Sequence, residues 1–278
     1  MSACIDAICQ KYGGVRIAGH DIALVPGLLN KLGAQPNLLA DLVEQYPIRG
    51  AGDEIEPRTV QWVGGDNAAL NYRGNPLKRE KIWLQRGSVT YGYKYYYYTG
   101  IQWKVVRAQT DWAQCPEIRN IAEQFDVFCT AVGAREANQA IITRYRDGDH
   151  FIGKHFDKAK SIAPSAAGRA SLITVIKIGE VGRRFNLYDL EDNILWSEII
   201  APGDALIMTL EANLQTKHEV PVSGAGEVVG DSGSIVFRSI CDVVPYKRVE
   251  KNIATSIKQA KARAEKKALA KTRPLRLP

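Results

Sequence analysis

The sequence predicts an α+β protein in which helices near the N-terminus pack on one face of a β-sandwich or jelly roll. Two observations lead to this fold class. Several segments before Val132 carry apolar residues at helical spacing. From Gln139 onward the chain becomes a series of short strand-like segments, rich in β-branched and aromatic residues and separated by Gly, Pro or Asp. With 278 residues, the chain is long enough to bury a full core.

Helices are expected in three segments of the N-terminal half. Residues 2 to about 12 have helical apolar spacing and end at Gly13-Gly14, and residues 37–45 place four apolar side chains on one face. Residues 116–132 are the clearest helix, because Pro116 suits a first turn and Gly133 follows the last apolar residue. Short strands are expected at residues 21–26 and 57–66.

Residues 64–90 are irregular and polar, which is more typical of a functional lid than of a structureless connection. The tyrosine-rich segment that follows has strand propensity and contains six tyrosines, Tyr91, Tyr93, Tyr95, Tyr96, Tyr97 and Tyr98. Such a segment could be a stacking platform for nucleic-acid bases. A tyrosine-rich strand packed against its neighbours explains it equally well.

The second half of the chain is expected to supply the strands of the sandwich or jelly roll. Each candidate strand is short and bounded by turn residues, and the segments are 140–145, 171–178, 184–188, 194–200, 205–210 and 234–240. Helices that precede these strands would then cover one face of the sheet, within a single domain.

A His-x-Asp pair is the first candidate for chemistry. In an extended strand, His155 and Asp157 point to the same face and Phe156 to the other. A third ligand from a distant strand would complete the two-histidine, one-carboxylate site of a non-haem Fe(II) oxygenase. His218 is the best candidate among four histidines, the others being His20 and His150. A hydrogen-bonded surface or core pair is the alternative.

Arg238 is the second informative residue, because the alternating face of its strand is otherwise apolar or small. A guanidinium on such a face is expected to be buried, and a buried charge needs a partner of opposite sign. That partner is either an Asp or Glu of this chain or the carboxylate of a ligand held by a bidentate contact.

The positive charge of the chain is concentrated at its C-terminal end. Residues 247–278 contain eleven Lys or Arg against Glu250 and Glu265, a net charge of +9, so residues 1–246 carry −2 of the total of +7. The tail is helix-prone but has few apolar residues. It could bind phosphates, act as a localisation signal, or be a solvated extension.

Several classes of protein are disfavoured by composition. No apolar run reaches the roughly 18 residues of a membrane span, and the N-terminus lacks the order of a signal peptide. We therefore expect an intracellular protein, cytoplasmic or nuclear, with no membrane partner. The five cysteines show no C-x-x-C pair, which indicates reduced thiols and no zinc knuckle.

Several motifs occur in order from about Ala23 to about Cys241 and together resemble the AlkB-type family of Fe(II)/2-oxoglutarate dioxygenases. They are Pro57-Arg58 with Trp62-Val-Gly, Tyr97-Tyr-Thr-Gly100, the segment from Asn138 through Tyr145 to His155-Phe-Asp157, Arg183-Arg-Phe, Pro202-Gly-Asp, Gln215-Thr-Lys-His218 and Ile235-Val-Phe-Arg238. The family acts on nucleic acids by oxidative dealkylation.

The resemblance implies a double-stranded β-helix with iron held by His155, Asp157 and His218. It implies that 2-oxoglutarate contacts Arg238, Tyr145 and Thr143, and that O2 is the third reactant. Residues 62–74 and 91–100 would form a lid over the substrate. The substrate contacts would come from Tyr96, Tyr98, Trp62, Arg184 and Lys158. Residues 1–246 would be the dioxygenase domain with an N-terminal extension, and residues 247–278 the basic tail.

The sequence departs from the family pattern at three positions. Many members have a second Arg six residues before the one that matches Arg238, where this chain has Ser232. Thr143 stands where Asn is common, and Lys158 follows the His-x-Asp motif where base-repairing members often have an acid. The first two departures concern the cosubstrate, and the third concerns the substrate.

Three functions are therefore compared. The first is removal of methyl or alkyl groups from bases in DNA or RNA, as in DNA repair, by a monomeric nucleic-acid-binding demethylase. The second uses the same iron chemistry to hydroxylate another modified base, a protein or a small molecule. The third is a nucleic-acid-binding module whose metal site is vestigial.

Overall fold

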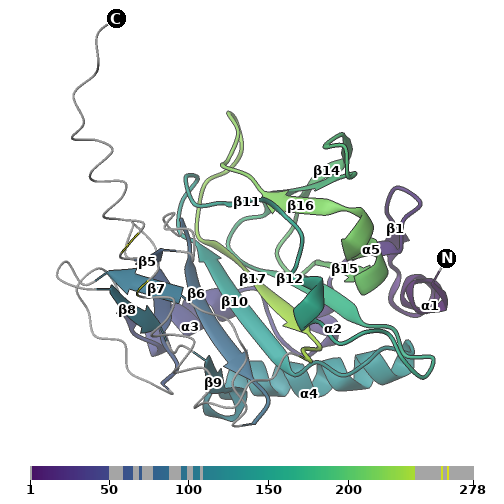
Figure 1. The fold of residues 1–278 in the computed structure, drawn as a ribbon, viewed down its shortest axis with the longest axis horizontal. Helices are drawn as coiled ribbons and strands as arrows, with labels where there is room; N and C mark the ends of the chain where they lie inside the picture. The colour runs from purple at the N-terminus through teal and green to yellow at the C-terminus, as the bar shows by residue number, and fades with distance from the viewer. Residues whose placement is uncertain are drawn as a thin grey trace, which may run out of the picture.

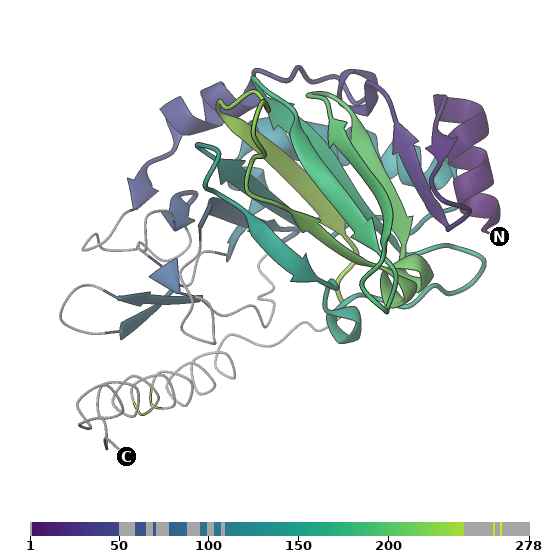
Figure 2. The same ribbon diagram turned by 90° about the horizontal axis from the view of Figure 1, so that it is seen from above.

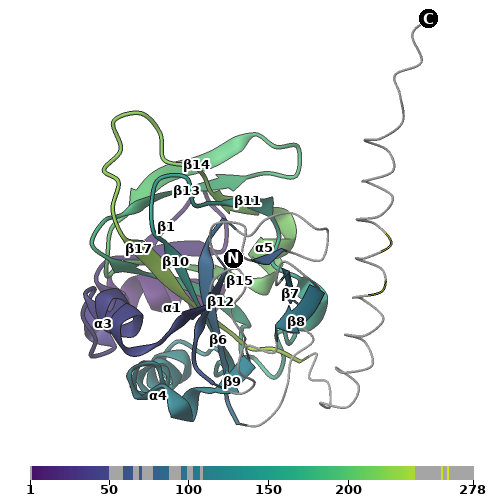
Figure 3. The ribbon, with the colours of Figure 1, turned by 90° about the vertical axis from the view of Figure 1, so that its left-hand side faces the viewer.

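Two β-sheets face each other and enclose the inner core, and helices cover the outer face of the larger sheet (Figures 1 and 3). The structure is a computed structural model that describes residues 2–49, 59–64, 69–70, 78–87, 95–98, 103–106, 109–241, 258 and 262. Within these residues the larger sheet has 10 strands and the facing sheet has 4.

Eight consecutive strands form a double-stranded β-helix. The chain passes between the sheets so that the central larger-sheet order is β15-β12-β17-β10 and the facing order is β11-β16-β13-β14. This is the jelly-roll order expected above. The strands are β10 (Gln139–Tyr145), β11 (Ile152–His155), β12 (Leu172–Gly179), β13 (Arg183–Tyr188), β14 (Ile194–Ile200), β15 (Ala205–Thr209), β16 (Lys217–Val220) and β17 (Ser232–Arg238).

The remaining strands extend the larger sheet or form a separate small sheet. The larger sheet gains β1 (Val15–Arg16), β2 (Ile22–Val25), β3 (Ile48–Arg49), β4 (Trp62–Gly64), β6 (Glu80–Gln85) and β9 (Gln109–Asp111). The small sheet has the order β5-β7-β8 and consists of β5 (Ala69–Leu70), β7 (Tyr95–Tyr98) and β8 (Trp103–Val106).

The helices are amphipathic and cover the outer face of the larger sheet (Figure 3). The longest, α4, stacks Phe125 on Phe237 of β17 with ring centroids 4.7 Å apart. Burying each phenyl ring stabilises the fold by roughly 1.5–3 kcal/mol. The helices of this layer are α1 (Ala3–Tyr12), α2 (Leu28–Lys31), α3 (Leu38–Gln45) and α4 (Pro116–Ala131). This layer matches the predicted helices at residues 2–12, 37–45 and 116–132.

Between the two sheets lies a second core, built by the period-two alternation of the strands. Ile173, Val175 and Met208 from the larger sheet meet Phe185 and Leu187 from the facing sheet. The short helices α5 (Leu210–Gln215), η1 (Trp112–Gln114) and η2 (Ala159–Ser161) complete the described elements. The metal-ligand candidates lie at one end of this inner core.

The prediction for residues 64–90 was wrong in part, because it contained no strand. Residues 80–85 form β6, in which all six residues are buried and which pairs with β10, β4 and β9. The strand was missed because polar residues occur on both of its faces, so the sequence lacks the apolar pattern of a buried strand. These polar residues are Glu80, Lys81 and Gln85. Apart from residues 258 and 262, the predicted basic tail lies outside the described residues.

Candidate metal centre

The structure brings together the two strand ends that carry the predicted ligands. His155 ends β11 and lies opposite His218 of β16 in the antiparallel register. Asp157 follows two residues beyond His155, and one ligand atom from each of these three residues lies within 4.8 Å of the others. In the described part of the chain no other group of three His, Cys, Asp or Glu side chains meets that condition.

The local chain path explains how Asp157 reaches this position although β11 ends before it. Phe156 is 42% exposed and points away from the site, as the alternation predicts. The backbone of Asp157 is held by Asn213 of α5, whose amide accepts from Asp157 N at 2.9 Å and donates to Asp157 O at 3.0 Å. Asn213 is fully buried. Nothing in the sequence marked it, because its partner lies 56 residues away.

The carboxylate partner of Arg238 is Asp157. Their side chains are 3.0 Å apart, and Arg238 also donates to Oε1 of Gln139 at 3.1 and 2.6 Å. The sequence left open whether Arg238 pairs with an acid of this chain or with the carboxylate of a ligand. The structure shows an ion pair with an acid of this chain. Burial alone would raise the pKa of Asp157, but Arg238, His218 and His155 outweigh it and lower that pKa to about 2. The carboxylate is thus ionised at neutral pH.

Both histidines are held in the neutral form that a metal requires. Burial lowers the pKa of His155, and burial together with His155 lowers the pKa of His218 to about 3. Nδ1 of His155 lies 2.8 Å from Gly153 O, so it donates to that carbonyl and leaves Nε2 as the ligand atom. Nδ1 of His218 is buried with no hydrogen-bond partner among the described residues. Two neutral imidazoles and one carboxylate fit Fe(II).

The residues predicted to bind the cosubstrate share the inner face of the larger sheet with Arg238. Thr143 pairs with Ser234, and Tyr145 pairs with Ser232, in the β10–β17 register. Both are buried, and burial raises the pKa of Tyr145 to about 12. In the register, Gln139 lies opposite Arg238, and Thr143 and Tyr145 follow it towards the other end of β10. A ligand that contacted Arg238, Thr143 and Tyr145 would therefore extend along the inner face of the sheet.

Two of the predicted substrate residues are corrected by the structure. Trp62 is fully buried in the core under the helices and donates its indole N–H to Leu42 O at 3.0 Å. Arg184 alternates with the inward-facing Phe185, so it lies on the outer face of β13, where it pairs with Glu227 at 2.5 Å. Neither side chain reaches the inner face that carries the candidate ligands.

The remaining predicted substrate residues lie near the site or outside the described side chains. Lys158 is exposed and directly follows Asp157. Tyr96 and Tyr98 lie on β7, a strand of which the structure describes the backbone alone. Their base-stacking role stays a prediction, as does the lid assigned to residues 62–74 and 91–100.

Buried cations on the inner faces were not foreseen from the sequence. Lys81 of β6 is buried, its pKa is well below the ordinary value because of burial, Arg79 and Arg238, and its charge is coupled to Asp157. Lys177 of β12 and Arg183 of β13 are also buried. Alternation on a predicted strand could have identified Lys177, since it shares a face with Val175 and Ile173.

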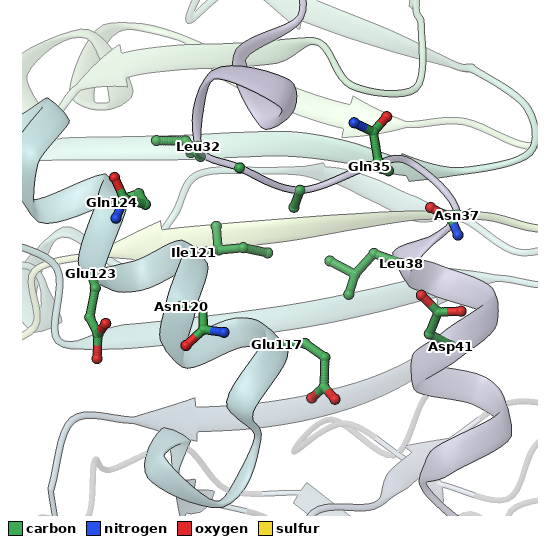
Figure 4. Close-up of a pocket in the computed structure, with 12 residues that line it drawn as sticks. Leu32, Gln35, Asn37, Leu38, Asp41, Glu117, Asn120, Ile121, Glu123 and Gln124 are labelled. Atoms are coloured by element: carbon green, nitrogen blue, oxygen red, sulfur yellow. The ribbon is translucent and has the colours of Figure 1, made fainter.

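A groove lies on the helix-covered side of the larger sheet, opposite the inner face that carries Arg238. Figure 4 shows it between α4 and the segment that leads into α3, with a volume of about 560 Å³. Its charged residues are Asp41, Glu117 and Glu123. It shares no residue with the candidate metal centre.

Among the helices of the described residues, none has the length and apolar character that a membrane span needs.

Comparisons with known proteins give similarity at the level of structure. No protein-family model matches the sequence, and no curated protein matches it. The structure of OsALKBH1 aligns with 12% identity and a TM-score of 0.43, covering 81% of this chain and 99% of that one. A 2OG-Fe(II) oxygenase family oxidoreductase from Burkholderia pseudomallei aligns with 13% identity and a TM-score of 0.42, covering 88% and 93%.

A prolyl hydroxylase from Trichoplax adhaerens, in complex with a hypoxia inducible factor peptide fragment, aligns with 9% identity and a TM-score of 0.45. The alignment covers 84% of this chain and 89% of the hydroxylase. The strand order and the ligand geometry are observed in this chain and do not depend on these alignments. The described residues thus combine a double-stranded β-helix with a His-Asp-His triad whose donor set fits Fe(II).

Proposed function

We propose that the chain is an Fe(II)- and 2-oxoglutarate-dependent dioxygenase that removes methyl or other alkyl groups from bases in DNA or RNA. The observation that supports the oxygenase chemistry is the meeting of His155, Asp157 and His218 within 4.8 Å at the end of the inner core. Two neutral histidines and one carboxylate leave coordination positions of an Fe(II) ion free for other ligands.

The protein's own part in this reaction is to hold and orient. His155, Asp157 and His218 would bind the iron, which together with O2 and 2-oxoglutarate supplies the oxidation of a substrate C–H bond. Arg238 keeps Asp157 ionised, and Asn213 fixes the backbone of Asp157 by two hydrogen bonds. These contacts orient the ligands before the metal binds.

The proposal of a nucleic-acid substrate is supported by the resemblance in sequence and by charge. Lys158 is exposed beside the triad, and Arg79 is close enough to His155 to lower its pKa. Residues 247–278 add a net charge of +9. Cations near a catalytic site suit a phosphate backbone, which supplies most sequence-independent affinity. A role in DNA repair belongs to the same proposal.

The decisive experiment measures two products. Succinate should form only with both Fe(II) and 2-oxoglutarate, and His155→Ala should abolish it. Formaldehyde should be released from methylated oligonucleotides, tested as single and double strands of DNA and RNA. Succinate without formaldehyde from any oligonucleotide would refute the dealkylase and leave oxidation of another base, a protein or a small molecule. Absence of Fe(II)-dependent succinate would refute the oxygenase and favour a vestigial metal site in a nucleic-acid-binding module.

The basic tail gives a separate test of nucleic-acid binding. Truncation after Val244 removes the net charge of +9 carried by residues 247–278. Affinity for single-stranded oligonucleotides should fall, and its dependence on salt concentration should flatten, because fewer phosphates are neutralised. Equal affinity and equal salt dependence of the two proteins would contradict a role of the tail.

A further inference from the structure

Lys177 places an amino group between the two sheets. It is 2% exposed, lies on the same face of β12 as Ile173 and Val175, and pairs with Ser234 of β17. Figure 2 shows β12 and β17 side by side in the larger sheet, as their register requires. Burying an ammonium group is costly unless an anion or several hydrogen bonds compensate it.

No anion of the described residues compensates Lys177 in this way. Its Nζ donates to Ser232 Oγ at 3.3 Å and lies 5.3 Å from the centroid of the Tyr145 ring. Among the described residues no carboxylate forms an ion pair with it. Burial, with a further contribution from Arg183, lowers its pKa to about 7. A bound anion would favour the protonated form of Lys177, because it would compensate the buried ammonium group.

The two ends of β17 differ in how their cations are neutralised. At the metal end, Arg238 already has Asp157 as its partner. At the other end, Ser232 occupies the position where the resembled family often has a second Arg, and its hydroxyl contacts Lys177. Ser232 and Arg238 share the inner face of β17, six residues apart. The ammonium of Lys177 thus stands beside the position of the absent guanidinium.

The neighbouring cations are engaged elsewhere. Arg183 donates to three backbone carbonyls, those of Asp147, His150 and Pro221, each at 2.8 Å. Lys81 pairs with Thr143 from the other side of β10, and its charge is coupled to Arg238 and Asp157, so it belongs to the metal end. Lys177 is therefore the best placed of these cations to bind a ligand carboxylate at the Ser232 end.

We infer that Lys177, assisted by Ser232 and Tyr145, binds the carboxylate of 2-oxoglutarate that is remote from the keto acid. This inference rests on the proposed function. It replaces the family's second Arg by a lysine on a different strand. It also makes the site selective for a dicarboxylate, because a monocarboxylic keto acid leaves Lys177 buried without an anion.

The test is a binding measurement that does not depend on turnover. Protein loaded with Mn²⁺ is titrated by calorimetry with 2-oxoglutarate and with 2-oxopentanoate, a keto acid of the same length that lacks the remote carboxylate. Lys177→Met should weaken 2-oxoglutarate binding by about 10- to 100-fold, the effect of one charged hydrogen bond, and leave 2-oxopentanoate binding unchanged. Lys177→Arg should retain most of the preference for 2-oxoglutarate.

Two further variants separate binding from folding. Thr174→Val alters the same strand on its other face, where the Thr174 hydroxyl has no hydrogen-bond partner among the described residues. This variant should bind both acids like the wild type. The double variant Lys177→Ala/Ser232→Arg removes the ammonium and places a guanidinium at Ser232, whose hydroxyl lies 3.3 Å from Lys177 Nζ. It should recover 2-oxoglutarate binding to within about tenfold of wild type.

The possible failures are distinguishable. If the wild type binds Mn²⁺ and 2-oxoglutarate, and Lys177→Met binds 2-oxoglutarate equally well or loses both keto acids equally, the inference is wrong and the proposed oxygenase function stands. If the wild type binds neither Mn²⁺ nor 2-oxoglutarate, the proposed function fails first.

Discussion

Replacing Arg238 by Met tests whether the Asp157–Arg238 ion pair contributes to the free energy of unfolding of the metal-free protein. The substitution keeps an unbranched apolar stem and removes the guanidinium, whose Nη1 lies 3.0 Å from Asp157 Oδ2. Asp157 would then be a buried carboxylate without its main counter-charge, and Oε1 of Gln139 would lose its donors. Removing one partner of a buried ion pair costs about 3–5 kcal/mol, so Arg238→Met should lower the free energy of unfolding by about that amount at pH 7.

The pH dependence of this loss follows from Asp157. Its pKa is about 2 in the folded chain against an ordinary 3.8, so its contribution to stability is complete above about pH 4 and is lost as pH falls towards 2. That difference corresponds to about 2 kcal/mol. Arg238→Met raises the pKa of Asp157 in the folded state. The gap in stability between wild type and variant should therefore narrow as pH falls below about 4.

The assay is urea unfolding followed by circular dichroism, with a chelator present, at pH 7 and at pH 3.5. Arg238→Lys is the charge-retaining control and should lose less stability than Arg238→Met. In Asp157→Asn/Arg238→Met the neutral amide needs no cation, so the double variant should be more stable than the sum of the two single losses predicts. A loss below about 1 kcal/mol for Arg238→Met, or strict additivity in the double variant, would refute this account of the pair.

Three other predictions follow from the same structure. His218→Ala should weaken Mn²⁺ binding by more than about 100-fold in a calorimetric titration while His20→Ala does not, and equal affinities would exclude His218 as a ligand. Phe125→Ala should cost about 3–5 kcal/mol in urea unfolding because its ring is buried, whereas the exposed Val127→Ala should cost little; similar losses would contradict the packing described. The folded pKa of Lys177 is about 7 against an ordinary 10.5, so between these values the unfolded chain binds more protons and metal-free stability should rise with pH. Lys177→Met should lack that rise, and an identical pH profile would show that Lys177 is not desolvated.

Much of the fold could be predicted because it depends on local periodicity. The apolar stripe of residues 116–132 predicts a helix, and the alternation in residues 234–240 predicts a strand with Arg238 on a buried face; the structure has α4 at Pro116–Ala131 and β17 at Ser232–Arg238. Strand β6 was missed because Glu80, Lys81 and Gln85 are polar yet buried. Glu80, for example, is buried against Arg144 of β10, and no local pattern records a contact across 64 residues.

By itself the sequence determined the alternation of the strands, the shared direction of His155 and Asp157, and the need of Arg238 for a carboxylate. Only the tertiary structure decided that this carboxylate is Asp157, that Lys177 meets Ser232, and that Trp62 faces the helices. The physical reason is that the partner of a buried side chain is set by the register between strands. Lys177 and Ser232 are 55 residues apart, and their contact exists only once β12 and β17 have paired.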